Sequence, residues 1–90
     1  GDVYKRQVHH LRTRNGDHEV DLVVERRDGR ILALEVKLAS TITDRDVKHL
    51  NWLQEELGPK LLDTVVISTG PQAYRRPDGI GVVPLVLLGL

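Results

Sequence analysis

The chain has 90 residues, of which 13 are basic and 13 acidic, and it contains no cysteine. This length allows one small domain, and the lack of cysteine excludes a disulfide framework and a thiolate metal site. Balanced charge gives no argument for nucleic acid, so such a partner would need a local patch. No run approaches the roughly 20 apolar residues of a membrane span, and the first residues lack the apolar region of a signal peptide. We therefore expect a cytoplasmic protein with no membrane partner.

Residues 1–7 are interpreted as a non-native or disordered leader, because the letters DVYKRQ resemble a translated sequencing-adaptor remnant. Residues 8–90 then form the domain. The apolar content comes mainly from Leu, Val and Ile, with no Phe or Met and a single Trp, which suggests part of a larger protein. We expect an N-terminally truncated fragment.

Two strands open the domain. Residues 8–13 form the first, and Asn15-Gly16 ends it, because both residues tolerate the positive φ of a tight turn. Residues 18–25 alternate between apolar and polar side chains, which is typical of a half-buried strand. The side chains predicted to face the core from this second strand are Val20, Leu22 and Val24.

The third strand, residues 31–38, is apolar almost throughout, as in a strand covered on both faces. Glu35 and Lys37 interrupt it. Because side chains alternate along a strand, these two project from the same face. Asp21, in the second strand, is a further acid where a core residue would be expected.

The turn at residues 26–30 decides whether these polar side chains meet. A two-residue loop, Asp28-Gly29, would put Val36 opposite Asp21 and send the acids to opposite faces. A three-residue loop with Gly29 in the left-handed conformation pairs Asp21 with Glu35 instead. We predict the three-residue loop.

A helix is predicted from Thr43 or Asp44 to about Leu57, because either of the first two can cap it and Gly58-Pro59 ends it. Val47, Leu50, Leu53 and Leu57 form its apolar stripe. Trp52 falls outside that stripe, so it either lies half-exposed or meets a surface outside this domain, and we expect the second.

Residues 61–69 form the next strand, parallel to residues 31–38 through a crossover by the helix. Residues 80–88 form the last strand, in which Pro84 predicts an edge position or a break. The order β, β, β, α, β, β predicts an α/β domain with a mixed sheet and one main helix.

Two carboxylates facing each other on neighbouring strands, here Asp21 and Glu35, can share Mg²⁺ or Mn²⁺, because hard cations take oxygen ligands. The ion would polarise a phosphoryl oxygen, and Lys37 would orient water and stabilise negative charge, which suits phosphodiester hydrolysis. A structural ion-pair cluster, in which Lys37 neutralises one acid, accounts for the same residues. The sequence leaves both interpretations open.

Residues 19–25, EVDLVVE, with residues 31–40, ILALEVKLAS, resemble the PD-(D/E)xK nuclease-like fold. The resemblance is closest to the C-terminal domain of unknown function that follows an AAA-type P-loop ATPase core in bacterial and archaeal proteins. It covers nearly everything after His10. It implies a restriction-endonuclease-like sheet in which Asp21 and Glu35 bind the metal and Lys37 positions the attacking water.

This resemblance implies metal-dependent cleavage of nucleic acid by the C-terminal domain of a prokaryotic ATPase. The chain lacks the extra acid that active nucleases of this fold often take from a preceding helix. It also lacks a P-loop motif, so ATP would bind to an N-terminal ATPase region absent from this chain. The alternative is a catalytically inactive accessory domain that binds DNA or a protein partner for the ATPase.

Overall fold

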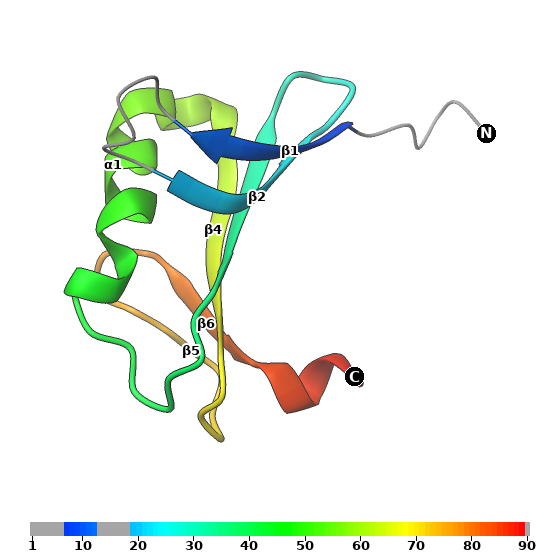
Figure 1. Cartoon of the computed structure of the whole chain (residues 1–90). Coiled ribbons are helices and arrows are strands. Elements are labelled where there is room, and N and C mark those ends of the chain that lie inside the picture. Colours follow the sequence, from blue (N-terminus) through cyan, green and yellow to red (C-terminus); the bar gives the residue numbers. More distant parts are fainter. Residues whose placement is uncertain (1–6, 13–18, 90) are drawn as a thin grey trace.

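A computed structural model describes residues 7–12 and 19–89 of the chain. The strands form one six-stranded mixed sheet in the order β1-β2-β3-β4-β6-β5, with helix α1 on one face (Figure 1). The expected mixed α/β fold with one main helix is confirmed, and a short strand, β5, is added to the expected order. The leader assigned to residues 1–7 lies outside the described residues except for Gln7, which begins β1. The strands and the α-helix are β1 (Gln7–Arg12), β2 (Glu19–Glu25), β3 (Ile31–Val36), α1 (Lys48–Leu57), β4 (Leu61–Ser68), β5 (Tyr74–Arg75) and β6 (Gly81–Pro84).

Helix α1 covers the sheet with the predicted apolar stripe. Leu50 and Leu53 are buried, and Leu57 packs partly against the same core. Trp52 is half-buried and packs partly against this core, and a contact with a surface outside the domain stays a prediction. No helix in the described part of the chain is long and apolar enough to cross a membrane. The buried core consists of Val20, Val23, Ala33, Ile42, Val47, Leu50, Leu53, Val66, Ile80 and Val82.

The loop between β2 and β3 has three residues, as predicted. The Arg26 amide donates to the Arg30 carbonyl at 2.8 Å, so this pair closes the loop. Gly29 has a φ of 85°, a left-handed conformation that glycine adopts without steric cost. The pairing that follows reaches Leu22 with Leu34, which is the predicted register.

The alternation predicted for β2 is wrong, because a β-bulge interrupts that strand. Strand β1 pairs His9 with Val23 but Leu11 with Val20, so one residue of β1 lies opposite two residues of β2. Val20 and Val23 are therefore both buried. The side chains that were expected in the core but are only half-buried are Leu22 and Val24.

The second half of the chain completes the sheet. Strand β4 runs parallel to β3, as predicted, and β6 runs parallel to β4. The strand expected at residues 80–88 breaks at Pro84 and continues as a 3-10 helix, Leu85–Leu88. Proline has no N–H to donate to a neighbouring strand, so the break falls where the sequence indicates it.

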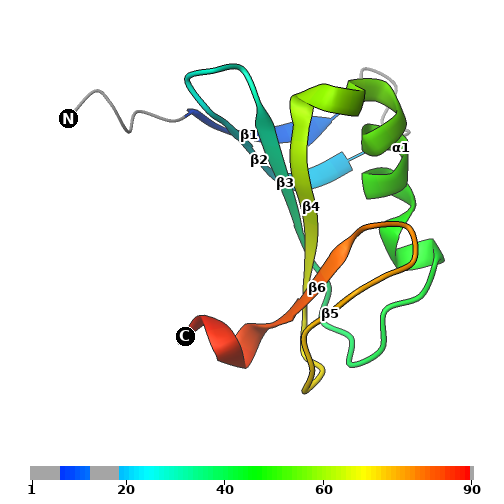
Figure 2. The ribbon, with the colours of Figure 1, turned by 180° about the vertical axis from the view of Figure 1, so that it is seen from behind.

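Seen from behind, β3 and β4 lie between α1 on one side and the C-terminal 3-10 helix on the other (Figure 2). The expectation that residues 31–38 are covered on both faces is wrong at the end of this segment. The side chain of Val36 is 46% exposed and that of Leu38 is 83% exposed. An apolar surface is thus left on the side of the sheet away from α1.

Candidate functional site

The candidate site lies where β2 leaves β3. The closing bond from Arg26 to Arg30 makes every second pair of the hairpin a hydrogen-bonded pair, so a regular ladder would join the Val36 amide to the Val20 carbonyl. The pairing of the strands ends before that point, at Leu22 with Leu34. The Val36 amide donates instead to the carboxylate of Asp21, at 2.9 Å. A side chain therefore takes the place of the backbone acceptor at this point, where β2 and β3 separate, which we call the fork.

Glu35 lies one residue from this hydrogen bond. Glu35 is the residue before Val36 in β3, whose amide donates to Asp21, but the pairing of β2 with β3 ends at Leu22 with Leu34, before it reaches the predicted pair of Asp21 with Glu35. Glu35 is 5% exposed, on the face of β3 that also buries Ala33 beneath α1. Asp21 is exposed. Asp21 thus contacts the backbone next to Glu35, while its own side chain is exposed and that of Glu35 is buried.

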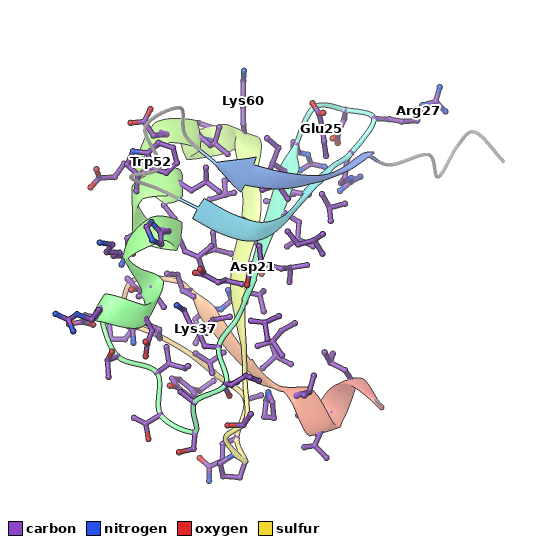
Figure 3. The ribbon with its side chains drawn as sticks, in the orientation of Figure 1. Asp21, Glu25, Arg27, Lys37, Trp52 and Lys60 are labelled. Carbon is purple, nitrogen blue, oxygen red and sulfur yellow. The ribbon has the colours of Figure 1, made fainter. Side chains whose placement is uncertain are left out.

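Lys37 follows on the same face as Glu35, just beyond β3. Its amide donates to the Ile67 carbonyl of β4 at 2.9 Å, so the backbone here stays in the sheet. Figure 3 shows Asp21 at the fork and Lys37 further along the course of β3. The side chain of Lys37 is half-buried. The three predicted site residues thus lie near the fork: Asp21 in β2, Glu35 in β3 and Lys37 just after β3.

Asp46 is a partner of Lys37 that the sequence does not reveal. It accepts hydrogen bonds from the Thr43 amide at 2.9 Å and the Thr43 hydroxyl at 3.1 Å, a capping arrangement at the start of the helical segment. The hydrogen bond from the Thr43 backbone amide is the main cause that lowers the pKa of Asp46. The positive charges of Lys37 and Arg76 lower it further. The charge of Lys37 therefore favours the ionised form of Asp46, an acid other than the predicted pair of Asp21 and Glu35.

The described residues at the fork offer oxygen atoms but no acidic cluster. Within residues 7–12 and 19–89 there is no group of three His, Cys, Asp or Glu side chains suited to a metal ion. Asp21 and Glu35 offer two carboxylates. The Val36 carbonyl points to the same edge of β3 as its amide, because both groups of a strand residue face one neighbour. Oxygen atoms are the ligands that Mg²⁺ and Mn²⁺ take, so these groups would hold such an ion, but the Glu35 side chain is buried.

Comparison with known proteins places the chain in a family. Residues 2–88 match the model of the Domain of unknown function (DUF4143). The chain belongs to the DUF4143 family. No curated protein matches it.

The fold of this DUF4143 domain is also found in a solved structure of EndoMS in complex with double-stranded DNA. The two chains superpose with a TM-score of 0.57 at 21% sequence identity. The match covers 93% of the DUF4143 chain and 38% of the EndoMS chain. At this identity the likeness establishes a shared fold, and the DUF4143 chain spans well under half of the EndoMS chain.

Proposed function

We propose that this DUF4143 domain binds nucleic acid and holds a divalent cation at the fork of β2 and β3. The observation that carries the proposal is the bond from the Val36 amide to Asp21, which fixes an exposed carboxylate beside Glu35. The fold that it shares with a protein seen in complex with double-stranded DNA supports nucleic acid as the partner. The assignment to the PD-(D/E)xK fold, and a place after an AAA-type ATPase core, form part of this proposal.

The reaction proposed for the fork is hydrolysis of a phosphodiester. Mg²⁺ or Mn²⁺, when bound, would supply a Lewis acid and a water of lowered pKa. Asp21 and Glu35 would hold the ion. Lys37 would place its ammonium next to the phosphate, where it orients the attacking water and stabilises the negative charge that develops on phosphate oxygens.

Cleavage assays on the whole chain test this function. Single- and double-stranded DNA and RNA are incubated with Mg²⁺ or Mn²⁺ and the wild-type protein, and with Asp21→Asn, Glu35→Gln and Lys37→Met. We expect each variant to lose at least about a hundredfold in rate. Glu55→Gln, an exposed acid on α1, serves as the matched control and should cut like wild type. Wild-type protein that neither cuts nor binds any of these nucleic acids would refute the proposal.

The alternative is an accessory domain without catalysis, which binds DNA or a protein partner for the ATPase. The burial of Glu35, at 5% exposure, favours this second function, because a ligand to a hydrated cation needs access to water. The charge interaction of Lys37 with Asp46, an acid outside the proposed pair, favours it too. Calorimetric titration with Mn²⁺ separates the two: the accessory domain takes up no ion, and Glu35→Gln then changes only its stability.

A further inference from the structure

A cavity lies beyond Lys37, at the carboxyl ends of the parallel strands β3 and β4. It has a volume of about 210 Å³. The loop after β3 and the turn after β4 form its walls, and both views show them at the same end of the molecule (Figures 1 and 2). The carboxyl ends of parallel strands are a common place for ligands in α/β sheets. The lining residues are Ser40, Thr41, Ser68, Gly70, Pro71, Gln72 and Tyr74.

The cavity continues the face that carries Lys37. Strand β3 pairs Glu35 with Val66 and Val36 with Ile67, so the next pair in register is Lys37 with Ser68. Ser68 is 2% exposed and shares the buried face of β4 with Val66. The backbone of Lys37 therefore lies beside Ser68, a lining residue of the cavity, on the neighbouring strand.

The walls of the cavity are held together by the backbone. The Thr69 amide donates to the Ala39 carbonyl at 3.1 Å, which ties the two loops to each other. Gly70 packs so closely on the Ser40 carbonyl that any side chain at position 70 would collide with it. The Gly70 amide in turn donates to the Ser68 hydroxyl at 3.2 Å. The cavity is thus preformed, which lowers the entropic cost of binding.

The chemistry of the lining is hydroxyl-rich, with one aromatic ring. The exposed hydroxyls of Ser40 and Thr41 can donate to phosphate oxygens, whereas the buried Ser68 hydroxyl accepts from the Gly70 amide and holds the wall in place. Tyr74 stands at the rim, 47% exposed, on strand β5, whose pairing with β6 fixes its backbone. An exposed ring fixed on a strand is a stacking platform for an unpaired base.

We infer that this cavity binds one unpaired nucleotide of a nucleic-acid strand, next to the phosphate at Lys37. Its hydroxyls hold the phosphate of that nucleotide, and Tyr74 stacks on the base. This rests on the proposed function, because it places the adjacent phosphate at the fork. The cavity is smaller than most small-molecule pockets, so it suits part of a polymer better than a whole free ligand.

Binding of labelled oligonucleotides to the whole chain tests the inference. The probes are hexamers of deoxythymidine and of uridine, the matching free mononucleotides, inorganic phosphate and a duplex. Fluorescence anisotropy follows the hexamers, and the other probes compete. We expect both hexamers to bind, with mononucleotides weaker, and phosphate and duplex weakest, since a paired base cannot stack on Tyr74.

Matched variants assign the binding to the cavity. Tyr74→Leu should weaken hexamer binding about tenfold or more, whereas Tyr74→Phe keeps the ring and should bind like wild type. Thr41→Val should weaken it severalfold, whereas Thr69→Val changes an exposed threonine outside the lining and serves as control. Chemical shifts of the Thr41 and Gly70 amides should move on addition of hexamer to the wild type.

The outcomes are distinct from those for the metal site. Hexamer binding that Tyr74→Leu and Thr41→Val leave unchanged, or that duplex or phosphate displaces as well as a hexamer does, overturns the cavity inference. The absence of any hexamer binding overturns it too. Mn²⁺ titration of the same samples reports on the fork separately: we expect Tyr74→Leu to bind the ion like wild type, and a wild type that binds hexamer but no ion refutes the metal site alone.

Discussion

The carboxylate of Asp21 accepts the backbone amide of Val36 at 2.9 Å, across the point where β2 leaves β3. This hydrogen bond gives the amide an acceptor that the neighbouring strand no longer provides. Asp21 therefore has a structural task that is independent of any metal. A substitution at this position acts on folding and on the proposed site at once, and the two effects need different variants to separate them.

Asp21→Ala removes the acceptor and should lower the free energy of unfolding by about 1 kcal/mol, the net value of one hydrogen bond. Asp21→Asn keeps a side-chain oxygen at the same place and should cost clearly less. Urea denaturation of the two variants beside wild type measures the difference. Equal losses in both variants would mean that the charge of Asp21, and not its acceptor, stabilises the fork.

Ion binding should raise stability only when both acids are present. At about 100 times its dissociation constant, Mn²⁺ would add about 2.7 kcal/mol to the free energy of unfolding, because it binds the folded chain alone. We expect this gain in the wild type and in Asp46→Asn, and its loss in Asp21→Asn and Glu35→Gln. Thermal unfolding with and without the ion, with Ca²⁺ as a comparison, gives the measurement. A gain that survives in Asp21→Asn would place the ion elsewhere.

The sequence predicts those parts of the site that depend on local chemistry. Gly29 determines the loop, and the loop determines the register, which the structure shows as far as Leu22 with Leu34. The bulge in β2 depends on how β1 pairs with it, so the alternation of apolar residues could not reveal that Val23 is buried. The interaction of Lys37 with Asp46 depends on how the helical segment docks on the sheet, which no spacing along the chain encodes.

Gly29→Ala tests the loop that sets this register. The substitution should cost about 1 kcal/mol, because an L-residue is disfavoured at φ 85°. The added Cβ meets nothing within 4 Å, so the cost lies in the backbone alone. Gly29→Asn should recover part of the loss, since Asn tolerates this conformation. Urea denaturation of both variants tests this, and an alanine variant as stable as wild type would contradict the left-handed turn.

Arg76 joins the loop before α1 to the turn before β6. Its guanidinium bonds to the Ile42 carbonyl at 3.3 Å and pairs with Asp44 and Asp78. The Arg76 side chain is 10% exposed, whereas that of Asp44 is 98% exposed and that of Asp78 26%. Water screens the pair with Asp44 far more than the pair with Asp78.

We expect Asp78→Asn to destabilise the chain by about 1 kcal/mol or more, and Asp44→Asn by less than about 0.5 kcal/mol. Arg76→Met should cost more than either, because it removes all three contacts while keeping much of the packing. Chemical denaturation at low and high salt checks the order. Equal losses for the two aspartate variants would show that exposure does not govern these pairs.

Asp46 should make stability depend on pH in the acid range. Its pKa in the folded chain is lowered from 3.8, mainly by the hydrogen bond from the Thr43 amide and further by the charge of Lys37. A lowered pKa means that the unfolded chain binds the proton more readily. The stabilisation from Asp46 is therefore fully present well above pH 3.8 and is lost as the pH falls through the lower folded value.

The measurement is the free energy of unfolding at pH 6 and at pH 3, for wild type and Asp46→Asn. The variant should be less stable than wild type at pH 6, and the gap should narrow at pH 3, because below pH 3.8 Asp46 binds a proton in the unfolded chain and this favours unfolding. Thr43→Val removes the hydroxyl but keeps the backbone amide, whose hydrogen bond lowers the pKa of Asp46 more. Its loss of stability at pH 6 should therefore be smaller than that of Asp46→Asn. A gap that stays constant between the two pH values would show that protonation of Asp46 is not coupled to unfolding in this range.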